Sequence, residues 1–80
     1  MEPDIRFTHG GKNYLVPYAA YSEIDALIVL PDGTIVSVLE WGEIFPPIPK
    51  RIVIVDETFV GTAQADVVHT VGGIVATEIL

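Results

Sequence analysis

The 80-residue sequence contains no cysteine and only four lysine and arginine residues. Without cysteine the chain offers no disulfide, no thiolate nucleophile, no Cys-ligated zinc site and no iron–sulfur cluster. Binding to a nucleic-acid backbone needs clustered Lys and Arg, but 11 acidic residues give this chain a net charge of −7. We therefore expect neither nucleic acid nor an anionic membrane surface as a partner.

Long apolar segments are also missing. The longest stretch without a formal charge, residues 67–77, has 11 residues and includes two glycines, whereas a transmembrane helix needs about 20 apolar residues. The N-terminal segment, Met1-Glu2-Pro3-Asp4, is acidic and lacks the apolar region of a secretory signal. These absences lead us to expect a cytoplasmic protein that does not span a membrane.

The residues that are present are unusually apolar for so short a chain. Half of them are hydrophobic, 19% are charged and the mean hydropathy is +0.49. Eighty residues form one small domain, 1–80, and a domain of this size buries only about 60% of its unfolded surface. Some apolar surface should therefore remain for contact with another chain. We expect a homo-oligomer, with a dimer favoured. Binding to a different protein is also compatible with this apolar composition.

Three tight-turn signals divide the sequence into β-prone runs. The first is Gly10-Gly11, which suits the positive φ angles of a type I′ hairpin turn. The expected hairpin joins residues 5–9 to residues 12–16 and puts an aromatic and an aliphatic pair on one face. Its predicted cross-strand pairs are His9 with Lys12, Phe7 with Tyr14, and Ile5 with Val16.

The second turn signal is Pro31-Asp32-Gly33, where proline suits the first corner and glycine the left-handed position. The resulting hairpin is apolar on both faces, which predicts cover from two sides, by this chain or by a second subunit. Its expected pairs are Leu30 with Thr34, Val29 with Ile35, and Ile28 with Val36.

The third signal, Gly72-Gly73, predicts a C-terminal hairpin that pairs Val71 with Ile74 and places His69 diagonally across from Glu78. Residues 52–55 add a short aliphatic strand that residues 58–60 extend, and residues 41–50 form an irregular, proline-rich connector. One or two helical turns are expected near 17–24.

Together these signals predict an all-β fold: a single small barrel or two-sheet sandwich of six to seven short antiparallel strands built from hairpins.

The proline-rich segment 41–51 is the main candidate for partner binding, because rigid loops with large aromatic residues supply many binding hot spots. Its proline spacing also resembles a polyproline II ligand followed by a basic residue. Two alternatives stay open: its aromatic side chains lid the end of the fold, or they form an interface. The candidate residues are Trp41, Ile44, Phe45, Pro46, Pro49 and Arg51.

A weaker candidate lies at the first turn, where His9 and Lys12 flank flexible backbone amides that suit an anion; a plain hairpin tip is the alternative. No catalytic residue, metal site or cofactor is predicted, because the two histidines stand 60 positions apart and no paired acid and base is evident.

Three functions follow as hypotheses. The leading one is a non-enzymatic interaction module that self-associates and presents residues 41–51 to itself or to a protein partner. The second is a small acidic inhibitor or decoy that binds a basic protein surface through Asp56, Glu57, Asp66 and Glu78. The third is an oligomeric protein that sequesters a ligand, with an anion site between subunits.

Overall fold

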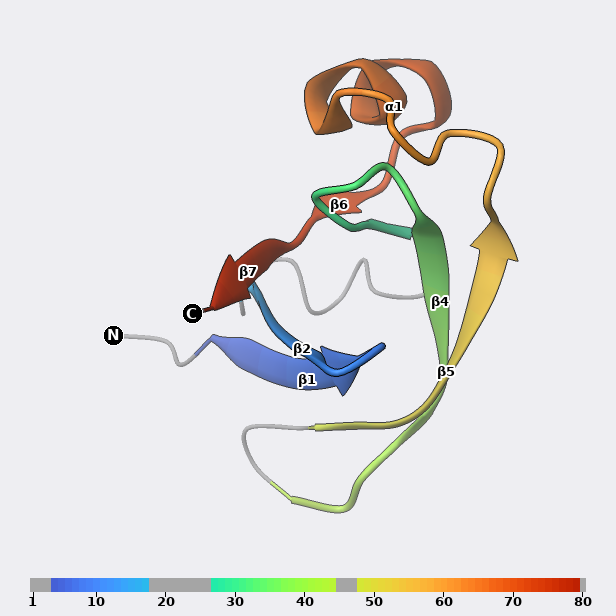
Figure 1. The fold of residues 1–80 in the computed structure, drawn as a ribbon. Helices are drawn as coiled ribbons and strands as arrows, with labels where there is room; N and C mark the ends of the chain where they lie inside the picture. Colours follow the sequence, from blue (N-terminus) through green and yellow to red (C-terminus); the bar gives the residue numbers. More distant parts are fainter. Residues whose placement is uncertain (1–3, 18–26, 45–47, 80) are drawn as a thin grey trace.

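The computed structural model describes residues 4–17, 27–44 and 48–79. Figure 1 shows two β-sheets and one short helix at the end of the molecule. The elements are β1 (Ile5–His9), β2 (Lys12–Val16), β3 (Ile28–Val29), β4 (Ile35–Trp41), β5 (Pro49–Asp56), α1 (Gln64–Val71), β6 (Ile74–Val75) and β7 (Thr77–Ile79). The single helix of the described residues is too short to cross a membrane.

The predicted all-β class is confirmed, since strands dominate the described residues. They form a three-stranded sheet in the order β1-β2-β7 and a four-stranded sheet in the order β5-β4-β3-β6, and the two sheets do not close into one barrel. The expectation of purely antiparallel strands is wrong at one place, because β3 and β6 run parallel. A parallel pair needs a long crossover connection, and the chain between β3 and β6 supplies it.

The first hairpin has the predicted register. All three predicted cross-strand pairs of β1 and β2 are present. Gly10 and Gly11 have φ angles of 61° and 79°, so both occupy the left-handed region that a type I′ turn requires. Phe7 and Tyr14 lie in contact across the hairpin, with ring centroids 5.5 Å apart.

The second hairpin also has the predicted register, and both of its faces are buried. Ile28 pairs with Val36 and Val29 with Ile35, and the Leu30 amide donates to the Thr34 carbonyl at 2.9 Å. One face belongs to the main core between the two sheets, whose buried members are Ile5, Phe7, Tyr14, Val16, Ile28, Leu30, Val36, Val38, Ile74 and Ala76. The opposite face, with Val29 and Ile35, packs against Val67 of α1.

The predicted C-terminal hairpin is wrong, because residues 64–71 form helix α1. Val67 and Val71 are four positions apart and lie on one side of a helix, and Val67 is fully buried against the β3–β4 hairpin. Gly72 ends the helix with a φ of 75°, and its amide donates to the Val68 carbonyl. The apolar second face of β3 and β4 needs cover, and a helix supplies it where a strand would leave the face open. His69 therefore lies in the last helical turn and has no cross-strand neighbour.

Gln64, the first residue of α1, holds the helix against the sheet. Its side-chain amide donates to the carbonyls of Val29 at 2.6 Å and of Ala76 at 2.8 Å, so it bridges the ends of β3 and β6. The buried Ala76 separates β6 from β7, and at this residue the chain passes from one sheet to the other.

The two ends of the expected irregular connector at 41–50 belong to the antiparallel strands β4 and β5, while residues 42–44 and 48 lie outside any strand. Trp41 pairs with Pro49, and the Gly42 amide donates to the Ile48 carbonyl at 2.8 Å. The pairing of β4 with β5 therefore extends further toward the hairpin tip than the three prolines of this segment suggested. Residues 45–47 and the expected helical turns after Pro17 lie outside the described residues.

Residues 58–60 form a turn rather than extending the strand. The Thr58 amide donates to the side chain of Asp56 at 2.7 Å, and this bond closes the end of β5.

The turn between β3 and β4 packs against the turn at residues 58–60, and the glycine at position 33 permits this close approach. Gly33 has a φ of 94°, and a Cβ atom there would meet the backbone carbonyl of Phe59. Gly61 has a φ of 89° but nothing within 4 Å of its Cβ position. Gly33→Ala should therefore cost about 2–5 kcal/mol of unfolding free energy, and the matched control Gly61→Ala only about 1–2 kcal/mol. Urea unfolding of both variants checks this, and equal losses would contradict the docking contact.

Candidate functional site

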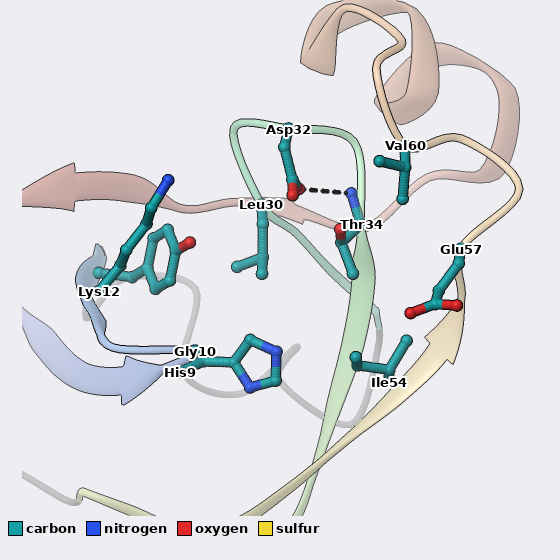
Figure 2. Close-up of a pocket in the computed structure, with 10 residues that line it drawn as sticks. His9, Gly10, Lys12, Leu30, Asp32, Thr34, Ile54, Glu57 and Val60 are labelled. Carbon is teal, nitrogen blue, oxygen red and sulfur yellow. Dashed lines mark hydrogen bonds between the residues drawn. The ribbon is translucent and has the colours of Figure 1, made fainter.

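A pocket of about 320 Å³ opens where the tip of the first hairpin faces the second sheet. Figure 2 shows its side chains coming from four segments: the β1–β2 turn, the β3–β4 turn, the end of β5 and the turn that follows β5. The lining residues are His9, Gly10, Lys12, Tyr14, Leu30, Asp32, Thr34, Ile54, Glu57 and Val60. The fold thus gathers at one opening residues that are up to 51 positions apart, since Val60 and His9 both line it.

The pocket carries charges of both signs. The structure brings the predicted pair His9 and Lys12 together there, but it adds the carboxylates of Asp32 and Glu57. Lys12 also lies 3.8 Å from the Glu78 carboxylate of β7 in an exposed ion pair, which contributes little to stability. The two added carboxylates disfavour a simple anion site, and sequence reasoning missed them because only the tertiary fold places them beside the first turn.

Tyr14 forms part of the floor of this pocket. Its side chain is buried and stacks at a tilt on Phe7. Burial raises the pKa of the Tyr14 phenol, because the charged form loses hydration. The hydroxyl therefore stays neutral at physiological pH and can donate a hydrogen bond there.

Asp32 orders the rim of the pocket. Its carboxylate accepts a hydrogen bond from the Thr34 amide at 2.9 Å, drawn as a dashed line in Figure 2. This bond lowers the pKa of Asp32 below its ordinary value of 3.8, because it stabilises the charged form. The Asp32 carbonyl accepts from the Gly61 amide at 2.7 Å. The first bond orders the β3–β4 turn at the pocket, and the second joins this turn to the turn that follows β5.

A second candidate region is the surface of the β4–β5 hairpin, residues 35–56. Six of the nine large hydrophobic side chains that are exposed among the described residues lie on it: Leu39, Ile44, Ile48, Val53, Ile54 and Val55. Leu39 and Ile44 are 55% and 58% exposed. Exposed apolar patches mark contact sites in soluble proteins, although successive strand residues such as Val53 and Ile54 face opposite sides of the sheet.

The predicted partner-binding residues have different positions on this hairpin. Trp41 packs partly buried against the main core, as the lid alternative expects, whereas Ile44 is exposed near the tip. Pro49 begins β5 opposite Trp41, and Arg51 pairs with Glu40 in the ladder. Phe45 and Pro46 lie outside the described residues. The exposed valines and isoleucine of β5 were not singled out from the sequence, although the run 52–55 was identified as a strand.

The acidic residues of the inhibitor hypothesis lie on separate elements. Asp56 and Glu57 are at the end of β5, Asp66 is in the first turn of α1, and Glu78 is in β7. Among the residues that the structure describes, no group of three or more histidine, aspartate and glutamate side chains is placed to hold a metal ion.

Comparison with models of protein families, with curated proteins and with solved structures finds no match.

The lowered pKa of Asp32 predicts how stability depends on pH. Its contribution is fully present above the pKa of the unfolded chain and is lost as the pH falls through the lower folded pKa. Asp32→Asn keeps an oxygen acceptor but removes the charge, so the stability difference between parent and variant should shrink as the pH falls from about 5 to about 2. Urea unfolding over this range measures it. Parallel pH curves for parent and variant would contradict the assignment.

Proposed function

We propose that residues 1–80 form one non-enzymatic, two-sheet interaction module that self-associates, and that its contact surface is the β4–β5 hairpin. The observation that carries the proposal is the concentration of exposed apolar side chains on this hairpin. Elsewhere in the described residues the large exposed hydrophobics are only Val60, Val71 and Val75. Exposing so much apolar area of one hairpin to water is unfavourable, so its burial against another chain favours association.

The hairpin is also well suited to present this surface. β4 is anchored in the sheet by β3 on one side and β5 on the other, and its inward residues Val36 and Val38 belong to the core. Trp41 fixes the far end of the strand by packing against the same core. A contact surface on rigid elements loses little conformational entropy on binding.

Ligand sequestration remains a second candidate, because the pocket beside His9 and Lys12 is open and lined by polar groups. Its mixed charges favour a ligand that carries both a cationic and an anionic group over a simple anion. The acidic-decoy hypothesis finds less support, since its four carboxylates are spread over three elements.

The first test is the mass of the purified protein in solution, measured by light scattering coupled to size exclusion at low and high salt. We expect a dimer at both salt concentrations, because apolar contacts are not screened. A monomer at both salts, at high micromolar concentration, would overturn self-association. A complex with a basic protein that dissociates steeply with salt would favour the decoy function instead.

Two serine variants test the location of the surface. Ile44→Ser/Ile48→Ser changes two exposed side chains near the hairpin tip and should raise the dimer dissociation constant about tenfold, since each loses apolar contact area. The matched control is Val71→Ser, an exposed valine at the end of α1, which should leave the dissociation constant unchanged. Sedimentation equilibrium measures both constants. Equal effects in the tip variant and in the control would exclude the hairpin tip.

A further inference from the structure

Strand β5 is one of the two edge strands of the four-stranded sheet, and the two-residue strand β6 is the other. It pairs with β4 on one side, and among the described residues no strand pairs with its other side. At eight residues it is the longest strand of the described chain, and Figure 1 shows it along the outer border of the sheet. An edge of this length presents a row of backbone donors and acceptors that can pair with another strand.

The middle of this edge contains no charged residue and no proline. Edge strands are commonly blunted by a central charge, a proline or a strong bulge, but residues 52–55 are all valine and isoleucine, and Pro49 lies only at the beginning of the strand. Val53, Ile54 and Val55 are exposed. The ladder with β4 is regular only from Ile52 to Ile54, because register shifts lie on both sides of this segment, between Arg51 and Ile52 and between Ile54 and Asp56. The centre of the edge, residues 52–54, is therefore apolar and regularly paired with β4.

The two ends of the strand carry opposite charges. Lys50-Arg51 precedes the apolar centre, and Asp56-Glu57 follows it. In a parallel pair of two such strands, bases would meet bases and acids would meet acids, which is destabilising. In an antiparallel pair each basic end lies beside an acidic end. The sequence of this edge is thus complementary in charge to its own reversed copy.

We propose that two copies of this chain associate by antiparallel pairing of their β5 strands, which joins the two four-stranded sheets into one sheet of eight strands. This inference rests on the proposed self-association and names its partner and its contact. A two-fold axis through an antiparallel pair passes between identical residues. With Val53 opposite Val53, Ile52 lies opposite Ile54, and the basic segment Lys50-Arg51 of one copy lies beside the acidic segment Asp56-Glu57 of the other.

The present contacts of the charged residues are compatible with this pairing. Lys50 lies 3.5 Å from Glu40 in an exposed ion pair, which is weak and leaves the ammonium with further hydrogen atoms to donate. Asp56 accepts from the Thr58 amide through Oδ1, and each of the two oxygens of a carboxylate can accept more than one hydrogen bond. Both side chains can engage the second copy without loss of these bonds.

The longest of the other edge strands, β1, fits less well. β1 borders the three-stranded sheet and also lacks a second strand partner among the described residues. Its sequence, Ile5–His9, contains Arg6 but no carboxylate. β1 is therefore complementary in charge neither to β1 of a second copy nor to the basic end of β5.

Charge reversal tests the pairing. Lys50→Glu/Arg51→Glu makes both ends of β5 acidic, and Asp56→Lys/Glu57→Lys makes both ends basic. Each variant alone should have a dimer dissociation constant at least about tenfold above that of the parent, because opposite-sign contacts become like-sign contacts. An equimolar mixture of the two should form a heterodimer, since their ends are complementary again. Light scattering and native mass spectrometry measure this.

A control separates local pairing from overall charge. Arg6→Glu/Lys12→Glu changes the net charge by the same amount as the first variant but lies on the other sheet, so its dissociation constant should stay near that of the parent. Recovery of association in the mixture also shows that both variants are folded, because unfolded chains cannot restore a strand pair.

Cross-linking tests the register. The chain has no cysteine, so Val53→Cys places a single thiol at the two-fold axis, where the two Cβ atoms should lie about 5 Å apart. Val55→Cys is the matched control, because its two copies would be offset by four residues, or about 13 Å. A short bifunctional thiol reagent should link the first variant and not the second. Equal linking of both variants would overturn the register centred on Val53.

The outcomes distinguish the two proposals. A parent that stays monomeric overturns self-association and the β5 pairing together. A parent that dimerises while both charge-reversed variants dimerise equally well overturns only the β5 pairing and leaves the hairpin surface as the contact. Loss of association in each variant with recovery in the mixture supports the antiparallel β5 contact.

Discussion

Burial of both faces of the β3–β4 hairpin is the constraint on which the rest of this structure depends. Its residues alternate between two sides, yet nearly all of them are apolar, so each side needs a separate layer. The three-stranded sheet covers one side and builds the main core. Helix α1 covers the other through Val67, and Gln64 fastens the helix to the ends of β3 and β6.

The same constraint explains why apolar side chains stay exposed on the outer face of β4 and β5. The chain has only eight described helical residues to cover the outer face of the four-stranded sheet, and α1 packs at the Val29 and Ile35 end. Leu39 and Val53, further from the helix, remain exposed. The apolar surplus visible in the composition is thus concentrated on one hairpin instead of being spread over the surface. A surface of this kind is stable in water when another chain covers it.

The turn after β5 connects the fold to the pocket. It is held to the β3–β4 turn by the bond from the Gly61 amide to the Asp32 carbonyl and by the close approach of Gly33 to Phe59. This contact brings Glu57 and Val60 beside the tip of the first hairpin, where His9 and Lys12 lie. The pocket and the pairing edge share the end of β5, so association at β5 would occur beside the pocket.

Local sequence was sufficient for the features that depend on neighbouring residues. Glycine readily adopts the positive φ angles that tight turns require, so the turns at Gly10-Gly11 and Pro31-Asp32-Gly33 predicted the registers of two hairpins correctly. The hairpin predicted at Gly72-Gly73 is wrong, because glycine also follows helices, and the otherwise uncovered face of Val29 and Ile35 favours a helix over residues 64–71. The parallel β3–β6 pair, the mixed charges of the pocket and the open edge of β5 arise from contacts between residues far apart in the chain. Local turn chemistry and strand propensity do not encode such contacts, so only the tertiary structure decided them.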